Sequence, residues 1–147
     1  MIYLLRHGTA ERGDGDDAAR RLTEQGEREA VAAGRAMAAL GLEVDTCLTS
    51  PKVRAVETAR LACEAFGIEP EVQQELAGSG YDTTAVATGR GNVMLVGHNP
   101  DFTTEVSRLT GAHAKLRKGG LAIIDGSVLV ALLRPEDLAA VAAGSTR

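Results

Sequence analysis

The chain of 147 residues has few aromatic residues, few histidines and no excess of positive charge. Aromatic residues make up 3% of it and tryptophan is missing, so platforms that stack bases or sugar rings have almost nothing from which to be built. The 16 lysines and arginines against 20 acidic residues give a net charge of −4. Because phosphate contacts along a nucleic acid need a clustered basic excess, no nucleic-acid partner is expected.

Features of secreted and membrane proteins are also missing. The only cysteines, Cys47 and Cys63, lie in apolar stretches without C-x-x-C spacing, so neither a disulfide framework nor a zinc site is expected. The apolar runs are far shorter than the roughly eighteen residues of a membrane span. The N-terminal segment lacks the basic start and the cleavage site of a signal peptide. We expect a reduced, cytoplasmic protein that binds no membrane.

What the chain does contain is an alternation of short apolar segments of β type with longer amphipathic segments. The expected strands span residues 2–6, 44–49, 92–96, 121–124 and 127–133, with a shorter extended segment at 71–76. The expected helices follow Thr23 as far as Gly41, run from Ser50-Pro51 to about Phe66 and from Asn99-Pro100 to about Gly111, and span 81–88 and 135–143. Residues 11–21 are expected to form a loop.

This order of elements predicts one α/β domain over residues 1–147, acting as a monomer or a weak dimer. Its sheet should be mainly parallel with helices on both faces, and the last two strands should form an antiparallel hairpin at its edge around the Asp125-Gly126 turn. Thr23 is interpreted as a helix N-cap. Ser50-Pro51 and Asn99-Pro100 are each interpreted as an N-cap followed by a proline at the first helical position.

Two of the three histidines directly follow predicted strands. His7 lies in Arg6-His7-Gly8 after the first strand, and His98 follows the strand at 92–96. Ligands of open α/β sheets bind outside the carboxyl ends of the strands, so both histidines can meet in one pocket. Arg54, near the start of the helix after the second strand, can face the same edge. Two imidazoles and two guanidiniums suit a tetrahedral oxyanion, because arginine pairs bidentately with phosphate oxygens.

Such a pocket predicts phosphoryl transfer with His7 as the nucleophile. The neighbouring Arg6 and Arg54 disfavour the imidazolium, so the pKa of His7 should leave its ring neutral near pH 7. The same arginines would neutralise charge on the transferring oxygens, and His98 would donate a hydrogen bond to them. A helix that begins at Pro100 would add the positive end of its dipole. This chemistry requires no metal and no cofactor.

The segment Leu4-Leu5-Arg6-His7-Gly8 resembles the signature of the histidine phosphatase superfamily, which includes phosphoglycerate mutases and acid phosphatases. Further segments, in the same order as far as about residue 135, are similar to the small SixA-type phosphohistidine phosphatases. They are Leu22-Thr23 with Gly26, Ser50-Pro51 with Arg54-Ala55 and Thr58-Ala59, Glu75-Leu76, Val96-Gly97-His98-Asn99-Pro100 and Lys118-Gly119-Gly120-Leu121-Ala122.

The resemblance implies a phosphoglycerate mutase-like fold, with His7 as the phosphorylated nucleophile. Arg6, Arg54 and His98 would form the rest of the phosphate pocket, and we expect Asn99 to bind substrate beside them. Mutase-type members carry an Asn several residues after R-H-G, where this chain has Gly13, and the stretch between Arg54 and His98 is too short for insertions that cover the pocket. The sequence therefore favours an open site, suited to a phosphoryl group on a protein surface.

The general acid is open at this stage. The alkoxide of a phosphate ester needs a proton donor, worth roughly 10²–10⁴-fold, whereas a phosphoimidazole leaves more easily. Glu75 lies in the segment where relatives carry their acid and is the first candidate. Glu11 and Asp82 are weaker candidates.

Three functions fit these residues. The first is a metal-independent phosphatase acting on protein phosphohistidine; the second is a phosphatase of small phosphomonoesters or nucleotide-type phosphates; the third is a non-catalytic phosphoprotein-binding module. A basic group near His113 either docks acidic substrates as a rim or is ordinary solvated surface. Its members are Lys115, Arg117 and Lys118.

Overall fold

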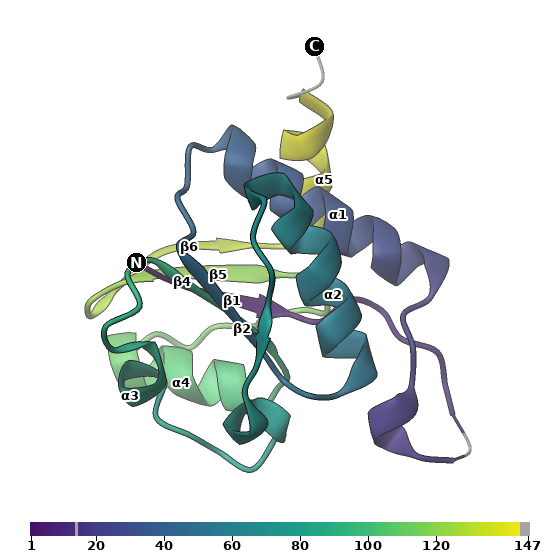
Figure 1. Ribbon diagram of the computed structural model, residues 1–147. Helices are drawn as coiled ribbons and strands as arrows, with labels where there is room; N and C mark the ends of the chain where they lie inside the picture. Colours follow the sequence, from purple (N-terminus) through teal and green to yellow (C-terminus); the bar gives the residue numbers. More distant parts are fainter. Residues whose placement is uncertain (14, 145–147) are drawn as a thin grey trace.

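The computed structural model describes residues 1–13 and 15–144, which are built around a mixed sheet in the strand order β3-β2-β4-β1-β5-β6 (Figure 1). The strands are β1 (Ile2–Arg6), β2 (Thr46–Thr49), β3 (Glu71–Val72), β4 (Val93–Gly97), β5 (Leu121–Asp125) and β6 (Val128–Leu133). β1, β2, β3 and β4 run parallel, whereas β5 is antiparallel to β1 and forms a hairpin with β6. The predicted parallel sheet with an antiparallel edge hairpin is confirmed.

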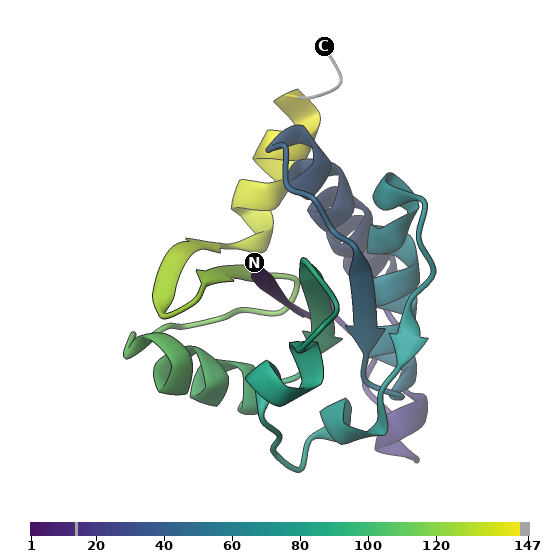
Figure 2. The ribbon, with the colours of Figure 1, turned by 60° about the vertical axis from the view of Figure 1, so that its left-hand side comes forward.

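Helices cover both faces of this sheet (Figures 1 and 2). The helices are α1 (Glu24–Ala39), α2 (Val53–Cys63), α3 (Thr83–Ala87), α4 (Asp101–Thr110) and α5 (Pro135–Gly144), with 3₁₀ turns η1 (Asp17–Ala19), η2 (Glu64–Phe66) and η3 (Gln74–Ala77). One buried cluster joins the sheet to α1, α2 and α5, and a second joins its other face to α3 and α4. The arrangement is a single α/β domain of the expected class.

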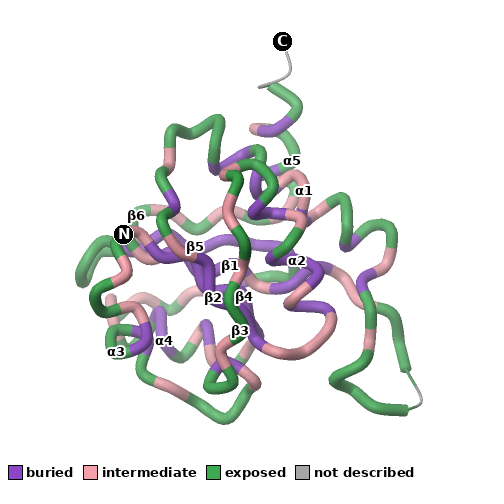
Figure 3. The backbone as a smooth tube through the Cα atoms, viewed as in Figure 1, coloured by how far each residue is buried: buried purple, intermediate pink, exposed green. Residues whose placement is uncertain are grey.

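The central strands are apolar on both sides because both sides are covered. Tyr3 and Leu5 of β1 belong to the cluster under α1 and α2, while Leu4 between them belongs to the cluster under α4. All of β4 is buried (Figure 3). Continuous apolar runs, rather than alternating ones, are therefore what these strands require.

Helix starts were only partly predicted correctly. Thr23 caps α1 as expected, since its hydroxyl accepts a hydrogen bond from the amide of Gly26 at 3.0 Å. α2, however, begins at Val53 with Lys52 as its N-cap residue, and α4 begins at Asp101 with Pro100 as its N-cap residue. Both prolines thus precede the first helical residue, because the chain needs extra residues to turn from the strand end into the helix.

The segment expected to be extended at residues 71–76 is only partly so. Of the extended segment expected at 71–76, only the first two residues form a strand, and the rest turns into η3. Cys47 and Cys63 are buried and free, as expected. Within the described part of the chain, no helix combines the length and the apolar character needed to cross a membrane.

Candidate active site

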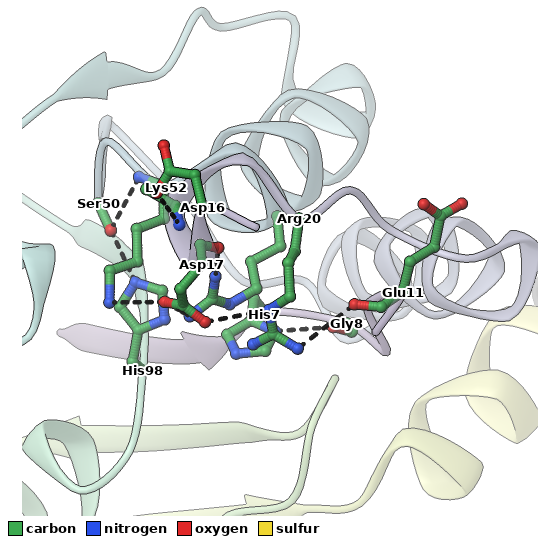
Figure 4. Close-up of polar contacts among 11 residues, drawn as sticks. His7, Gly8, Glu11, Asp16, Asp17, Arg20, Ser50, Lys52 and His98 are labelled. Atoms are coloured by element: carbon green, nitrogen blue, oxygen red, sulfur yellow. Dashed lines mark hydrogen bonds and ion pairs between the residues drawn. The ribbon is translucent and has the colours of Figure 1, made fainter. Parts of the chain in front are cut away.

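His7 and His98 lie side by side because β1 and β4 are parallel neighbours. Their register sets Arg6 opposite Gly97, so the next residue of each strand leaves the sheet at the same carboxyl edge. The amide of His7 donates to the carbonyl of Gly97 at 3.0 Å, and the centroids of the two imidazole rings are 5.2 Å apart (Figure 4). The structure therefore brings together the two histidines that the sequence placed at strand ends.

The loop after β1 needs its glycine because it packs directly on α1. A Cβ on Gly8 would lie 2.6 Å from the carbonyl oxygen of Gly26, and a Cβ on Gly26 would collide with the carbonyl of Thr9. On the other side, the amide of Gly8 donates to the hydroxyl of Thr58 at 3.1 Å. That hydroxyl donates in turn to the carbonyl of Arg54 at 2.7 Å. These contacts connect the His7 loop to α1 and α2 and leave it little freedom.

The ring of His7 is held through Nδ1, which leaves Nε2 available. Its Nδ1 lies 2.7 Å from the carbonyl oxygen of Gly8, and since a carbonyl only accepts, Nδ1 carries the proton and Nε2 keeps a lone pair. Burial lowers the pKa of His7 to about 4, with smaller contributions from the charges of Arg54, Arg6 and Lys118. The sequence argument ascribed this neutrality to the arginines, but loss of water around the ring is the larger cause.

His98 is oriented through Ser50, the residue that follows β2. Its Nε2 lies 2.7 Å from the Ser50 hydroxyl oxygen, which also accepts a hydrogen bond from the amide of Lys52 at 3.2 Å. The hydroxyl proton is free to be donated to Nε2, and in that arrangement the proton of His98 lies on Nδ1. That Nδ1 is buried without a protein partner (Figure 4). Burial, followed by the influence of His7 and the charge of Arg54, lowers the pKa of His98 to about 3.

Arg54 reaches the same place from the first turn of α2 and is 5% exposed. Its two terminal nitrogens donate to Asp17, one to the backbone carbonyl at 2.9 Å and one to the carboxylate at 3.3 Å. The Lys52 ammonium is 3.5 Å from the same carboxylate (Figure 4). Arg54 Nε is buried without a partner, so part of this guanidinium is free to bind a further acceptor.

Arg6 and Asn99 are both held by one carbonyl. Arg6 Nη1 donates to the Leu116 carbonyl at 3.1 Å, and Asn99 Nδ2 donates to it at 2.9 Å. Arg6 Nε and Asn99 Oδ1 are both buried without a partner. The pocket thus contains several polar atoms whose hydrogen-bonding capacity is not used by the described residues.

The three carboxylates considered as general acids make their contacts elsewhere. Glu75 is exposed on η3, where it accepts from Gln73 at 3.2 Å. Glu11 is exposed in the loop after β1. Asp82 caps α3 and accepts from Arg108 at 2.9 Å. In the described residues none of the three is hydrogen-bonded to either histidine, and Asp17 is the carboxylate that contacts the cations of the pocket.

Comparison with known proteins places this geometry in a family. Residues 2–84 match the sequence profile of the histidine phosphatase superfamily (branch 1). The chain belongs to this superfamily. The family match, together with the phosphatases among the similar structures described next, supports a phosphatase and therefore an enzyme.

Several relatives of this histidine phosphatase cover most of its length. An uncharacterized protein from Picosynechococcus sp. is 34% identical over 134 aligned residues, which cover 82% of this chain and 81% of the relative. The crystal structure of the candidate phosphohistidine phosphatase SixA from Agrobacterium tumefaciens superposes with a TM-score of 0.82 at 28% identity, over 91% of this chain and 97% of that one. The histidine phosphatase SixA complexed with tungstate has the same fold, with a TM-score of 0.80 at 22% identity over 93% and 98% of the two chains.

A basic cavity of about 790 Å³ opens beside the candidate phosphate pocket of this histidine phosphatase. The charged residues that line it are Arg6, Arg28, Arg117 and Lys118 together with Glu29 and Glu136, so positive charge is in excess. The charge of Lys118 contributes to the lowered pKa of His7, which places the edge of the cavity within electrostatic range of the nucleophile. Lys115, which the sequence grouped with Arg117 and Lys118, lines a different cavity near His113.

Three residues at the site escaped the sequence argument. Ser50 was interpreted as a helix cap, although its position after β2 places it at the same sheet edge as His98, a signal that was available. Lys52, two residues after Ser50, also follows the end of β2 and could have been found by the same reasoning. Asp17 lies in residues 11–21, which were expected to form a loop but contain the η1 turn; the segment has no periodicity, so no sequence signal points to Asp17. Among residues 1–13 and 15–144, no group of three or more metal-ligating side chains is placed to hold a metal ion.

Proposed function

We propose that this phosphatase hydrolyses phosphohistidine on proteins, without a metal, through a phosphohistidine intermediate on His7. The observation that carries the proposal is the state of His7 itself. The ring is neutral at physiological pH, its Nδ1–H is bonded to Gly8, and its Nε2 lone pair is free beside the cations of Arg6 and Arg54. A neutral imidazole with a free nitrogen is the form that attacks phosphorus.

In the first step the Nε2 lone pair of His7 forms a bond to phosphorus while the bond between phosphorus and the substrate nitrogen breaks. The electron pair of that bond stays on the substrate ring. Arg6 and Arg54 neutralise the equatorial oxygens, and His98 donates its Nδ1–H to one of them. In the second step water attacks phosphorus, the pair of the N–P bond returns to Nε2, and the water proton passes to the released phosphate or to solvent.

The leaving group is the reason for favouring phosphohistidine over phosphate esters. An alkoxide needs a proton from a positioned acid, and two of the acid candidates, Glu75 and Asp82, are hydrogen-bonded to residues outside the site. An imidazole departs without such help. The similarity to the candidate phosphohistidine phosphatase SixA and to the protein histidine phosphatase SixA, the latter in complex with the tetrahedral oxyanion tungstate, supports the same choice. The cavity beside Arg6 gives room for substrate groups beyond the phosphoryl, which is compatible with a protein substrate.

The test compares substrates under metal-free conditions. Initial rates would be measured with a phosphohistidine-bearing protein and with a panel of phosphomonoesters, in the presence of EDTA. We expect the phosphohistidine protein to have the highest kcat/KM, with EDTA leaving the rate unchanged. Faster hydrolysis of the esters would overturn the substrate assignment, and loss of activity with EDTA that returns on adding a divalent cation would overturn metal independence.

A further inference from the structure

Asp17 brings an ionised carboxylate to the cations of the phosphate pocket. Its Oδ2 lies 3.3 Å from Arg54 Nη2 and 3.5 Å from Lys52 Nζ, and its Oδ1 accepts from Arg20 Nε at 3.0 Å. The backbone carbonyl of Asp17 accepts from Arg54 as well, which holds the η1 turn against α2. The carboxylate is nevertheless 60% exposed, whereas His7 and His98 are buried, so Asp17 lies at the outer edge of the site.

This carboxylate is an acceptor of hydrogen bonds and not a proton donor. Loss of solvent raises the pKa of Asp17, but the charges of Arg54, Arg20 and Lys52 outweigh that effect and hold the pKa below its usual value. Asp17 is thus negatively charged throughout the neutral range. A negative group at the outer edge of the site treats leaving groups differently according to the charge they carry as they depart.

We propose that Asp17 is a specificity-determining residue, which selects a phosphorylated imidazole by accepting a hydrogen bond from the ring nitrogen that does not carry the phosphoryl group. The inference rests on the proposed function and adds to it how the site distinguishes phosphohistidine from esters. Arg54 and Lys52 then bind two anions, the phosphoryl oxygens and the Asp17 carboxylate. The imidazole ring of the substrate lies between these two anions.

The step balances without any further proton. The substrate ring, protonated on its second nitrogen and held so by the carboxylate, loses the phosphoryl group to His7 Nε2. The P–N bond breaks, its electron pair stays on the departing nitrogen, and the proton remains on the second nitrogen. The product is a neutral imidazole. An ester instead releases an anion, which has no N–H to donate and is repelled by Asp17.

The alternative is that Asp17 only competes with phosphate for Arg54 and Lys52. Removing its charge would then speed all substrates alike, because every substrate carries the same phosphoryl group. Selection by the leaving group predicts opposite effects on the two kinds of substrate. The ratio of the rate on phosphohistidine to the rate on an ester therefore distinguishes the two explanations.

The experiment uses Asp17→Asn, an isosteric change on an exposed turn, and Asp16→Asn as its matched control. Asp16 lies in the same turn and its side chain accepts from the amide of Ala18, which an asparagine oxygen can also do. For each protein, kcat/KM would be measured with a peptide phosphorylated on its histidine ring and with p-nitrophenyl phosphate, whose leaving group departs as an anion.

For D17N we expect kcat/KM on the phosphohistidine peptide, divided by kcat/KM on p-nitrophenyl phosphate, to fall about tenfold relative to the wild type. This is the effect of losing one hydrogen bond to a charged group. The alkaline limb of the phosphohistidine pH profile should move to lower pH, because the carboxylate no longer keeps the substrate ring protonated. D16N should keep the wild-type ratio. An unchanged ratio in D17N, or an equal gain on both substrates, would overturn the role of Asp17. Wild-type enzyme without phosphohistidine activity would instead overturn the proposed function.

Discussion

The pocket has an interior side and a rim, and the two differ in how their side chains are held. On the interior side, His7 and His98 are 5% and 6% exposed and are bonded to Gly8 and Ser50. On the rim, Asp17 is 60% exposed and is held by ion pairs with Arg54, Lys52 and Arg20. Buried neutral hydrogen bonds fix a ring in one tautomer, whereas exposed ion pairs are worth little and yield readily to an incoming anion.

In the proposed mechanism, this difference assigns the chemical steps to the interior side and the choice of substrate to the rim. The interior is preorganised before substrate arrives, which is how electrostatic catalysis avoids reorganisation during the reaction. The rim can exchange one set of ionic partners for another. Substitutions in the interior should therefore abolish or slow turnover on every substrate, and those on the rim should change the preference among substrates.

The largest effect is expected for His7→Ala. Removal of the nucleophile should lower kcat by about 10⁴-fold or more on every substrate and abolish the acid-labile phosphoenzyme formed from labelled substrate. His113→Ala is the matched control, since His113 is exposed and contacts neither catalytic histidine. Retention of phosphoenzyme in the His7 variant would show that the nucleophile lies elsewhere.

A smaller effect is expected for Ser50→Ala, which tests the interior as a preorganised unit. Without the hydroxyl, His98 loses the donor that keeps its proton on Nδ1, so kcat should fall about tenfold while KM changes less. Nitrogen NMR of the His98 ring should show one tautomer in the wild type and a mixture in the variant. Ser107→Ala, at an exposed position of α4, should change neither. A single unchanged tautomer in Ser50→Ala would remove Ser50 from the site.

The interior side was also the more predictable from sequence. Hydrophobic runs mark the strands, and the rule that parallel strands end at one edge then places His7 and His98 near one another. Arg54 follows from its distance after β2. Ser50 was visible but misinterpreted, because Ser-Pro is also a helix-start signature and α2 begins two residues later than that signature implies.

The rim was not predictable because it depends on contacts between distant segments. Asp17 reaches Arg54 only after η1 packs on α2, and no periodicity in residues 11–21 signals that approach. The basic residues of the loop before β5 show the same limit, since Lys118 lines the cavity beside Arg6 while Lys115 lines another cavity. Glu75 stays a prediction as an acid, to be judged by the rate of Glu75→Gln on esters.

The smallest expected effect is on the acid limb of the pH profile, which tests burial as the cause of the neutral nucleophile. For kcat/KM the reactive form is neutral His7, and activity falls as pH falls through the pKa of about 4. At pH 5 the wild type should therefore lose only about a tenth of its activity, whereas a histidine with its ordinary pKa of about 6.5 would lose nearly all of it. Rates would be taken over short times and corrected for spontaneous hydrolysis of the acid-labile substrate. Lys118→Met removes a minor contribution to the lowered pKa, so its midpoint should rise only slightly. A wild-type midpoint near 6.5 would mean that water reaches the ring and that the interior is not preorganised as the structure describes.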